Sequence, residues 1–305
     1  MSLSEKTKKW LSARNLSLKG KTVLVTGANS GVGYKTAETA LYLGAAVIMA
    51  CRNAERAEKA ASELQREYPE SEIRIMKLDL ADISSIDEFV AEIREKQADI
   101  DVFVNNAGVF HQAGKKTGDG FELVIGTNYI GLYYLTEKLL PYLQTLPHPV
   151  TYINTISIVH RTASVDYQDF WCEKHYRDLK VYARSKLCIA KYSYALTRRL
   201  QGSNIRVVMS HPGIAITPLA LNPYGEVVKK LAKVFGFLFQ SPEKSALAMA
   251  YILSSDLPAG SIAGPRHLFG GWGYPEENRV VRRVKEGGEE LISFTEEELA
   301  KHKSD

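Results

Sequence analysis

Short apolar runs and amphipathic stretches alternate along the chain. The apolar runs are often β-branched and show little polar alternation, which is typical of strands buried on both faces of a parallel sheet. They cover residues 22–25, 46–50, 73–78, 102–104, 150–153 and 205–209. Helical patterns cover residues 34–43, 54–68, 84–96, 120–143, 181–201 and 242–253. This alternation predicts an α/β fold with a doubly wound parallel sheet and helices on both faces.

We expect one domain over residues 1–305, because no internal repeat or low-complexity linker divides the chain. Residues 1–18 contain an N-terminal helix. Residues 218–240 are apolar with interspersed lysines and follow the sixth strand, at the sheet edge where open α/β folds bind ligands. They form either a flap over an apolar substrate or a helix against the core or a second subunit. Residues 275–305 form a charged C-terminal tail that packs, swaps between copies or stays solvated.

The composition narrows the function classes. The 305 residues carry a net charge of +4, and basic residues stand beside acidic ones, so a nucleic-acid partner is not expected. The three cysteines are unpatterned, which indicates free thiols and no metal site. No run reaches the length of a membrane span and no secretory signal is visible, so we expect a cytoplasmic protein. Lysines around Trp10 allow weak contact with a membrane surface, but a plain solvated N-terminal helix is the favoured interpretation.

Three glycines, Gly27, Gly31 and Gly33, stand between the first strand and the first long helix. Backbone N–H groups at a helix start favour an anion, and glycines let the backbone approach a pyrophosphate closely. The spacing differs from the common dinucleotide fingerprint, yet its place at the head of a βαβ series is the required context. We therefore predict a Rossmann-type dinucleotide site.

Tyr182 and Lys186 lie four residues apart in a helical pattern, so their side chains share one face. A free phenol is a weak base at neutral pH, and a neighbouring ammonium lowers its pKa. Tyr182 then becomes suited to acid–base catalysis. Ser157, at the end of the fifth strand, can donate a hydrogen bond to the substrate oxygen with which Tyr182 exchanges its proton.

Seven short motifs, which follow one another along the chain, resemble those of the short-chain dehydrogenase/reductase family over about residues 18–275. They are TGANSGVG at 26–33, DL at 79–80, NNAG at 105–108, TNYIG at 127–131, INTIS at 153–157, YARSK at 182–186 and HPG at 211–213. Further stretches at 47–60, 120–131 and 264–277 resemble the retinol-dehydrogenase-like and protochlorophyllide-reductase-like branch, and residues 165–187 favour the retinoid type. The resemblance implies a homo-oligomer, a dimer or a tetramer, as one option.

The resemblance also implies four catalytic residues: Asn128, Ser157, Tyr182 and Lys186. Asn128 would hold a water that links Lys186 to solvent. One departure is Ile156, which stands where many members have a first serine. The expected cofactor-binding residues are Gly27, Asn29, Ser30, Gly31, Val32, Gly33, Arg52, Asn53, Asp79, Leu80, Asn106, Ala107, Gly108, Tyr182, Lys186, Pro212, Gly213, Ala215 and Thr217.

The end of the second strand carries no carboxylate for an adenosine ribose; it carries Arg52 instead. Arg52 can pair with a 2′-phosphate, and Ser30 and Asn53 can add hydrogen bonds. NADP(H) is therefore expected over NAD(H), and the resemblance implies that Asp79 meets the adenine. The predicted reaction interconverts an alcohol and a carbonyl on a mid-sized apolar substrate, retinoid-like, steroid-like or an aromatic ketone. The alternatives are a C=C reductase of the protochlorophyllide type and a non-catalytic NADP(H) sensor.

Overall fold

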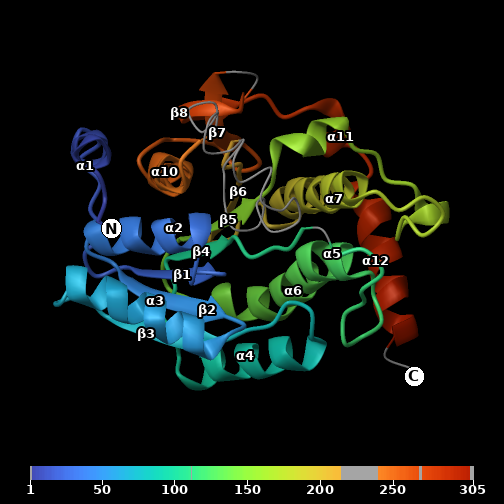
Figure 1. The fold of residues 1–305 in the computed structure, drawn as a ribbon, viewed down its shortest axis with the longest axis horizontal. Helices are drawn as coiled ribbons and strands as arrows, with labels where there is room; N and C mark the ends of the chain where they lie inside the picture. Colours follow the sequence, from blue (N-terminus) through green and yellow to red (C-terminus); the bar gives the residue numbers. More distant parts are fainter. Residues whose placement is uncertain (1, 111, 214–239, 268–269, 303–305) are drawn as a thin grey trace, which may run out of the picture.

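The computed structural model describes residues 2–110, 112–213, 240–267 and 270–302. Within them, eight strands form one sheet in the order β3-β2-β1-β4-β5-β6-β7-β8. Neighbours from β3 to β7 are parallel, and β8 pairs antiparallel with β7 (Figure 1). The strands are β1 Thr22–Thr26, β2 Ala46–Cys51, β3 Ile73–Lys77, β4 Val102–Asn105, β5 Val150–Thr155, β6 Ile205–Ser210, β7 Ile262–His267 and β8 Trp272–Asn278.

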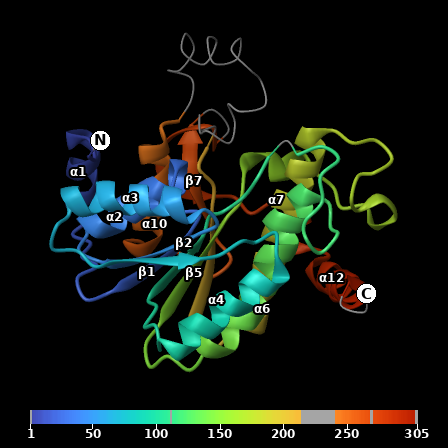
Figure 2. The ribbon, with the colours of Figure 1, turned by 60° about the horizontal axis from the view of Figure 1, so that its bottom comes forward.

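Helices cover both faces of this sheet. Helices α2, α3 and α10 lie on one face, and α4, α6 and α7 lie on the other (Figure 2). The helical segments are α1 Glu5–Ser12, α2 Gly31–Tyr42, α3 Ala54–Glu67, α4 Ile83–Glu95, α5 Leu123–Ile125, the π-helical η1 Gly126–Gly131, α6 Leu132–Leu143, the 3₁₀ turns η2 Ile158–Thr162 and η3 Tyr167–Asp169, α7 Asp178–Arg199, α10 Pro242–Leu253, α11 Arg282–Lys285 and α12 Gly288–His302. The doubly wound fold predicted from the sequence is confirmed.

The predicted elements differ from the observed ones in two places. The helix expected from residue 120 begins at Leu123 and passes through the π-helical turn η1 before α6. A β-carbon on Gly131 would collide with the carbonyl oxygen of Leu80, so this turn approaches the loop after β3 closely. The sequence pattern also does not predict β7 and β8, which contain Pro265 and Pro275 opposite one another. Proline is tolerated only near sheet edges, which is where this pair lies.

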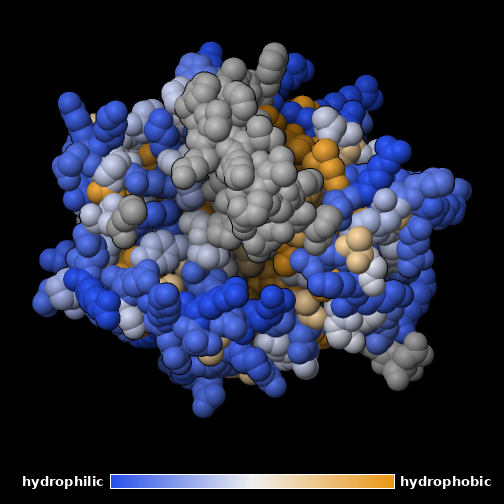
Figure 3. Space-filling view, viewed as in Figure 1, coloured by the Kyte–Doolittle hydropathy of each residue, from blue (hydrophilic) through white to orange (hydrophobic). Residues whose placement is uncertain are grey.

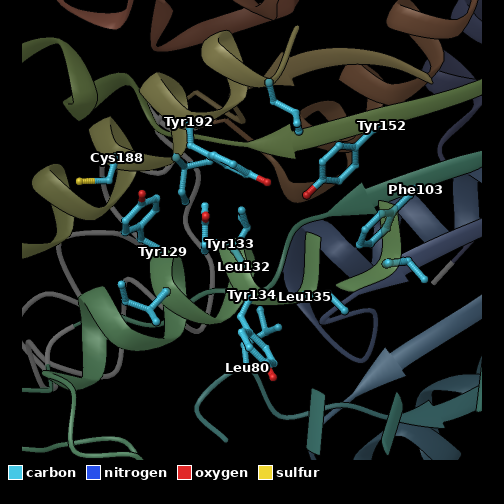
Figure 4. Packing of buried hydrophobic residues seen from close by; sticks show 14 of the residues in the cluster. Leu80, Phe103, Tyr129, Leu132, Tyr133, Tyr134, Leu135, Tyr152, Cys188 and Tyr192 are labelled. Carbon is cyan, nitrogen blue, oxygen red and sulfur yellow. The ribbon is translucent and has the colours of Figure 1, made fainter. Parts of the chain in front are cut away.

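The expected charged tail packs onto the body of the protein. Helix α12 lies beside α7 (Figure 1), with Leu291 and Leu299 buried. The hydroxyl of the fully buried Tyr129 shares a hydrogen bond of 2.8 Å with Thr295 on α12. Figure 4 shows Tyr129 among the apolar side chains of this face. The described part of this segment therefore packs onto the body of the protein and is not simply solvated.

The N-terminal helix is not simply solvated, so the favoured interpretation is corrected. Leu3 and Leu11 are buried, and Trp10 stacks on Tyr274 with ring centroids 5.5 Å apart. The Ser4 hydroxyl donates to Glu243 on α10 at 2.5 Å. The apolar side chains of α1 are thus used inside the fold. Among the described residues, no helix is both long and apolar enough to cross a bilayer.

Some predictions fall on the remaining part of the chain. The expected substrate flap at 218–240 lies outside the described residues except for Gln240, and so do Ala215 and Thr217.

Candidate active site

A pocket of about 600 Å³ opens at the carboxyl ends of the parallel strands. It runs from the glycine loop after β1, past the ends of β2 and β4, to β5 and α7. Apolar side chains gather near the centre of the face shown in Figure 3. Every described residue predicted to bind the cofactor lines this pocket. They are Gly27, Asn29, Ser30, Gly31, Val32, Gly33, Arg52, Asn53, Asp79, Leu80, Asn106, Ala107, Gly108, Tyr182, Lys186, Pro212 and Gly213.

The glycine loop has the shape that an anion site requires. Gly27 and Gly31 have φ values of +68° and +57°, a region that L side chains rarely adopt. A β-carbon on Gly33 would collide with the carbonyl oxygen of Gly27, so only glycine lets α2 start this close to the turn. No acidic residue stands in the first turn of α2, and the Ser30 side chain makes no capping hydrogen bond there. The helix start therefore presents N–H groups and a positive dipole end to the pocket.

Thr26 joins the glycine loop to the loop after β4. Its hydroxyl oxygen accepts the backbone N–H groups of Asn106 and Ala107 at 3.0 and 2.9 Å. The same hydroxyl donates to Asn105 Oδ1 at 3.0 Å. The sequence analysis missed this role, although the threonine directly before Gly27 in the quoted motif was a usable signal.

Tyr182, Ser157 and Lys186 meet at the other end of the pocket. The Ser157 side chain is the hydrogen-bonding neighbour of the Tyr182 phenol and lowers its pKa. The Lys186 ammonium lies 5.8 Å from the centre of the Tyr182 ring and donates to the carbonyl oxygen of Thr155 at 2.9 Å. The i, i+4 spacing on α7 thus places these two side chains together, as predicted.

Burial dominates the electrostatics of this trio. Burial raises the pKa of Tyr182 to about 12, and the hydrogen bond from Ser157 offsets only part of that rise. Burial also lowers the pKa of Lys186 to about 8. Burial is thus the largest influence on the pKa of Tyr182 in the protein without a bound nucleotide. The phenol is protonated at neutral pH and is ready to give a proton rather than take one.

Asn128 lies behind the pocket and does not line it. Its Oδ1 accepts the N–H of Val109 at 2.6 Å, and its Nδ2 donates to the carbonyl oxygen of Val109 at 2.9 Å and to Ser185 Oγ at 3.1 Å. The side chain therefore holds the loop after β4 against α7. The expected water-holding role stays a prediction, and the observed contacts are those of a positioning residue.

The far end of the pocket is basic. Arg52 is 64% exposed and lies 3.9 Å from Asp79 Oδ2 through its Nε. The Asn53 side chain accepts the N–H of Arg56 at 2.8 Å and caps α3, so its expected contact with a phosphate would compete with this cap. Arg56 also lines this end. Sequence reasoning missed Arg56, although its place in the first turn of α3, four residues after Arg52, was a usable signal.

The substrate end of the pocket is apolar. Phe110 packs edge-on against Tyr182 with ring centroids 5.1 Å apart. Leu179, which precedes Tyr182 on α7, is 59% exposed at this end. The other apolar lining residues here are Val109, Ile156, Ile158 and Val159. Ile156 occupies the place of the first serine of the family motif and adds to this apolar wall.

Comparisons with known proteins agree with this geometry. The family model described as short chain dehydrogenase matches residues 21–223. Retinol dehydrogenase 13 of Homo sapiens is 38% identical over 238 residues, covering 76% of this chain and 72% of that protein. A crystal structure of an uncharacterised protein from Mycobacterium paratuberculosis is 32% identical with a TM-score of 0.74, covering 92% of this chain and 94% of the other.

A more distant structure shares the fold. L-sorbose reductase from Gluconobacter frateurii, complexed with NADPH and L-sorbose, has a TM-score of 0.63 at 21% identity and covers 81% of this chain and 95% of its own. The family match and the retinol dehydrogenase relative decide the assignment. The chain belongs to the short-chain dehydrogenase/reductase family, in its retinol-dehydrogenase-like branch, and is an oxidoreductase.

Proposed function

We propose that this enzyme uses NADP(H) to interconvert an alcohol and a carbonyl on a mid-sized apolar substrate. The observation that carries the proposal is the joining of Tyr182, Ser157 and Lys186 in one pocket with the glycine loop and Arg52. The apolar wall around Phe110 and Ile156 supports an apolar substrate. The name of the human relative, retinol dehydrogenase 13, points to the same substrate class.

The residues divide the chemistry among themselves. The bound nicotinamide supplies or accepts the hydride, while the protein supplies position and the proton. Ser157 donates a hydrogen bond to the substrate oxygen, and Tyr182 passes its phenolic proton to that oxygen during reduction. Lys186 places a positive charge beside the resulting phenolate and stabilises it. Because the pKa of Tyr182 is raised to about 12, the protonated form that reduction needs is present at neutral pH.

The preference for NADP(H) is supported by the basic end of the pocket. Arg52 and Arg56 both line it, and a guanidinium suits a phosphate. The weak, exposed pair of Arg52 with Asp79 leaves the arginine available to a 2′-phosphate. L-sorbose reductase, which shares the fold, is complexed with NADPH in its crystal structure.

The test starts with the purified protein. NADPH and NADH are titrated by cofactor fluorescence, and turnover of all-trans-retinal, a steroid ketone and an aromatic ketone is followed at the nicotinamide absorbance. Removing the acid–base hydroxyl by Tyr182→Phe should lower kcat by about 10²-fold or more and leave NADPH affinity nearly unchanged. Tyr194→Phe is the matched control, because it removes the hydroxyl of another tyrosine of α7 that is half-buried and does not line the pocket.

The outcomes separate the alternatives. NADPH-dependent turnover with an alcohol product supports the proposal, and product analysis distinguishes it from reduction of a C=C bond. Tight NADPH binding without turnover of any substrate would favour the sensor. A fully active Tyr182→Phe enzyme would refute the assigned proton donor.

A further inference from the structure

The carbonyl of Ser157 is held twice by one residue. Ser157 stands directly before the 3₁₀ turn η2, with extended backbone angles. Its carbonyl oxygen accepts the backbone N–H of His160 at 3.0 Å. The same oxygen lies 2.6 Å from Nδ1 of the His160 ring. Both lone pairs of this carbonyl are therefore directed at His160, which fixes the peptide plane that follows Ser157.

The contact determines the form of the imidazole. A carbonyl only accepts, so Nδ1 must carry the hydrogen and Nε2 has none in the neutral ring. The side chain is fully buried, and burial lowers the pKa of His160, with the charges of Arg161 and Arg283 acting in the same direction. Arg161 comes from η2 itself, Arg283 from α11, and His211, which follows β6, is also nearby. The ring is thus a neutral Nδ1–H donor at neutral pH.

This arrangement connects His160 to the reacting groups without direct contact. The Ser157 side chain is the hydrogen-bonding neighbour of the Tyr182 phenol, and the direction of the Ser157 hydroxyl depends on the backbone of that residue. The carbonyl of that residue is fixed by the two bonds from His160. We propose that His160 is a positioning residue for the reaction, which aims the Ser157 hydroxyl through its Nδ1–H bond to the Ser157 carbonyl. This inference rests on the proposed function, because it needs Ser157 and Tyr182 to act on the substrate.

Two substitutions of His160 form a matched pair. In His160→Asn, the amide nitrogen takes the place of Nδ1 and can still donate to the Ser157 carbonyl. His160→Leu replaces the imidazole with an apolar side chain of similar size that has no hydrogen-bond donor. Thr162→Val is the control in the same turn, since the Thr162 hydroxyl donates to Val159 and not to Ser157.

The experiment compares steady-state kinetics, NADPH affinity and thermal unfolding of these variants with the wild type. Wild-type turnover is measured first, and its absence would refute the proposed function rather than this inference. We expect His160→Leu to lower kcat for carbonyl reduction about tenfold with little change in NADPH affinity. His160→Asn should recover to within about threefold of the wild type, and Thr162→Val should equal the wild type.

A double-mutant cycle tests whether the effect passes through Ser157. With Ser157→Ala as background, His160→Leu should cause no further loss of kcat, because there is no hydroxyl left to aim. Equal losses in both backgrounds would overturn the inference. So would a His160→Asn enzyme as impaired as His160→Leu, a result that stays decisive if Ser157→Ala turns over too slowly to measure.

Discussion

Replacing Arg52 with glutamine tests the origin of the cofactor preference. The Arg52 side chain is 64% exposed, and its Nε lies 3.9 Å from Asp79 Oδ2, so the resident ion pair is worth less than about 1 kcal/mol. A hydrogen bond from a guanidinium to a phosphate is worth about 1.5–3 kcal/mol, and exposure favours the lower value. A loss of about 1.5 kcal/mol corresponds to about a tenfold rise in the Kd for NADPH. NADH has no 2′-phosphate, so its Kd should change less than about twofold.

The assay is a fluorescence titration of each variant with both nucleotides at low and high salt. The effect on NADPH should shrink at high salt, since exposed charges are screened. Arg66→Gln is the matched control, because Arg66 lies in the last turn of α3 and does not line the pocket. Equal losses for NADPH and NADH, or no loss for either, would refute the assignment of Arg52 to the 2′-phosphate.

Three further predictions follow from the geometry. Gly33→Ala should weaken NADPH and NADH alike by about tenfold or more in the same titration, because its β-carbon collides with Gly27, whereas Gly118→Ala, with nothing closer than 3.8 Å, should not. The rate of reduction should fall as pH rises through about 8, where Lys186 loses its charge, and a pH profile that stays flat to pH 10 would contradict this. Leu291→Ala should lower the free energy of unfolding in urea by about 3 kcal/mol, because the Leu291 side chain is on the buried face of α12. The control Glu297→Ala, at an exposed position of the same helix, should change it by less than about 0.5 kcal/mol.

Strands β7 and β8, at one edge of the sheet, could not be predicted from the pattern of apolar and polar residues. Strands β7 and β8 contain glycine, proline and charged residues, so neither alternation nor a continuous apolar run marks them. They form because β7 pairs with β6 and β8 pairs with β7. Pairing with an existing sheet supplies hydrogen bonds that overcome weak local preference.

The packing of the two terminal helices, α1 and α12, also depends on residues that are distant in the sequence. The basic residues of α1 predict solvation, yet Trp10 meets Tyr274 from β8, and Ser4 meets Glu243 from α10. Helix α12 is highly charged, yet Tyr129 and Thr295 join across 166 residues of sequence. The partners of these side chains are distant in the chain, so local periodicity contains no information about them.

The candidate site was more predictable, because its main signals are local. The glycine spacing after β1 and the i, i+4 pair on α7 depend on residues a few positions apart, and parallel strands bring their carboxyl ends to one edge. The described cofactor residues, predicted partly from this spacing and partly from the family resemblance, line one pocket. Asn128 does not line the pocket, since its side chain bonds Val109 and Ser185, and its role with a water stays a prediction.

The sequence by itself thus determined the doubly wound sheet, the glycine loop and the chemical identity of the Tyr182, Ser157 and Lys186 trio. The tertiary structure decided the environment of that trio, since burial raises the pKa of Tyr182 to about 12 and lowers that of Lys186 to about 8. It also decided how the glycine loop is held, because the Thr26 hydroxyl bonds the backbone of Asn106 and Ala107 about 80 residues further along the chain. Spacing along the chain sets which groups can meet, and packing sets the energies at which they react.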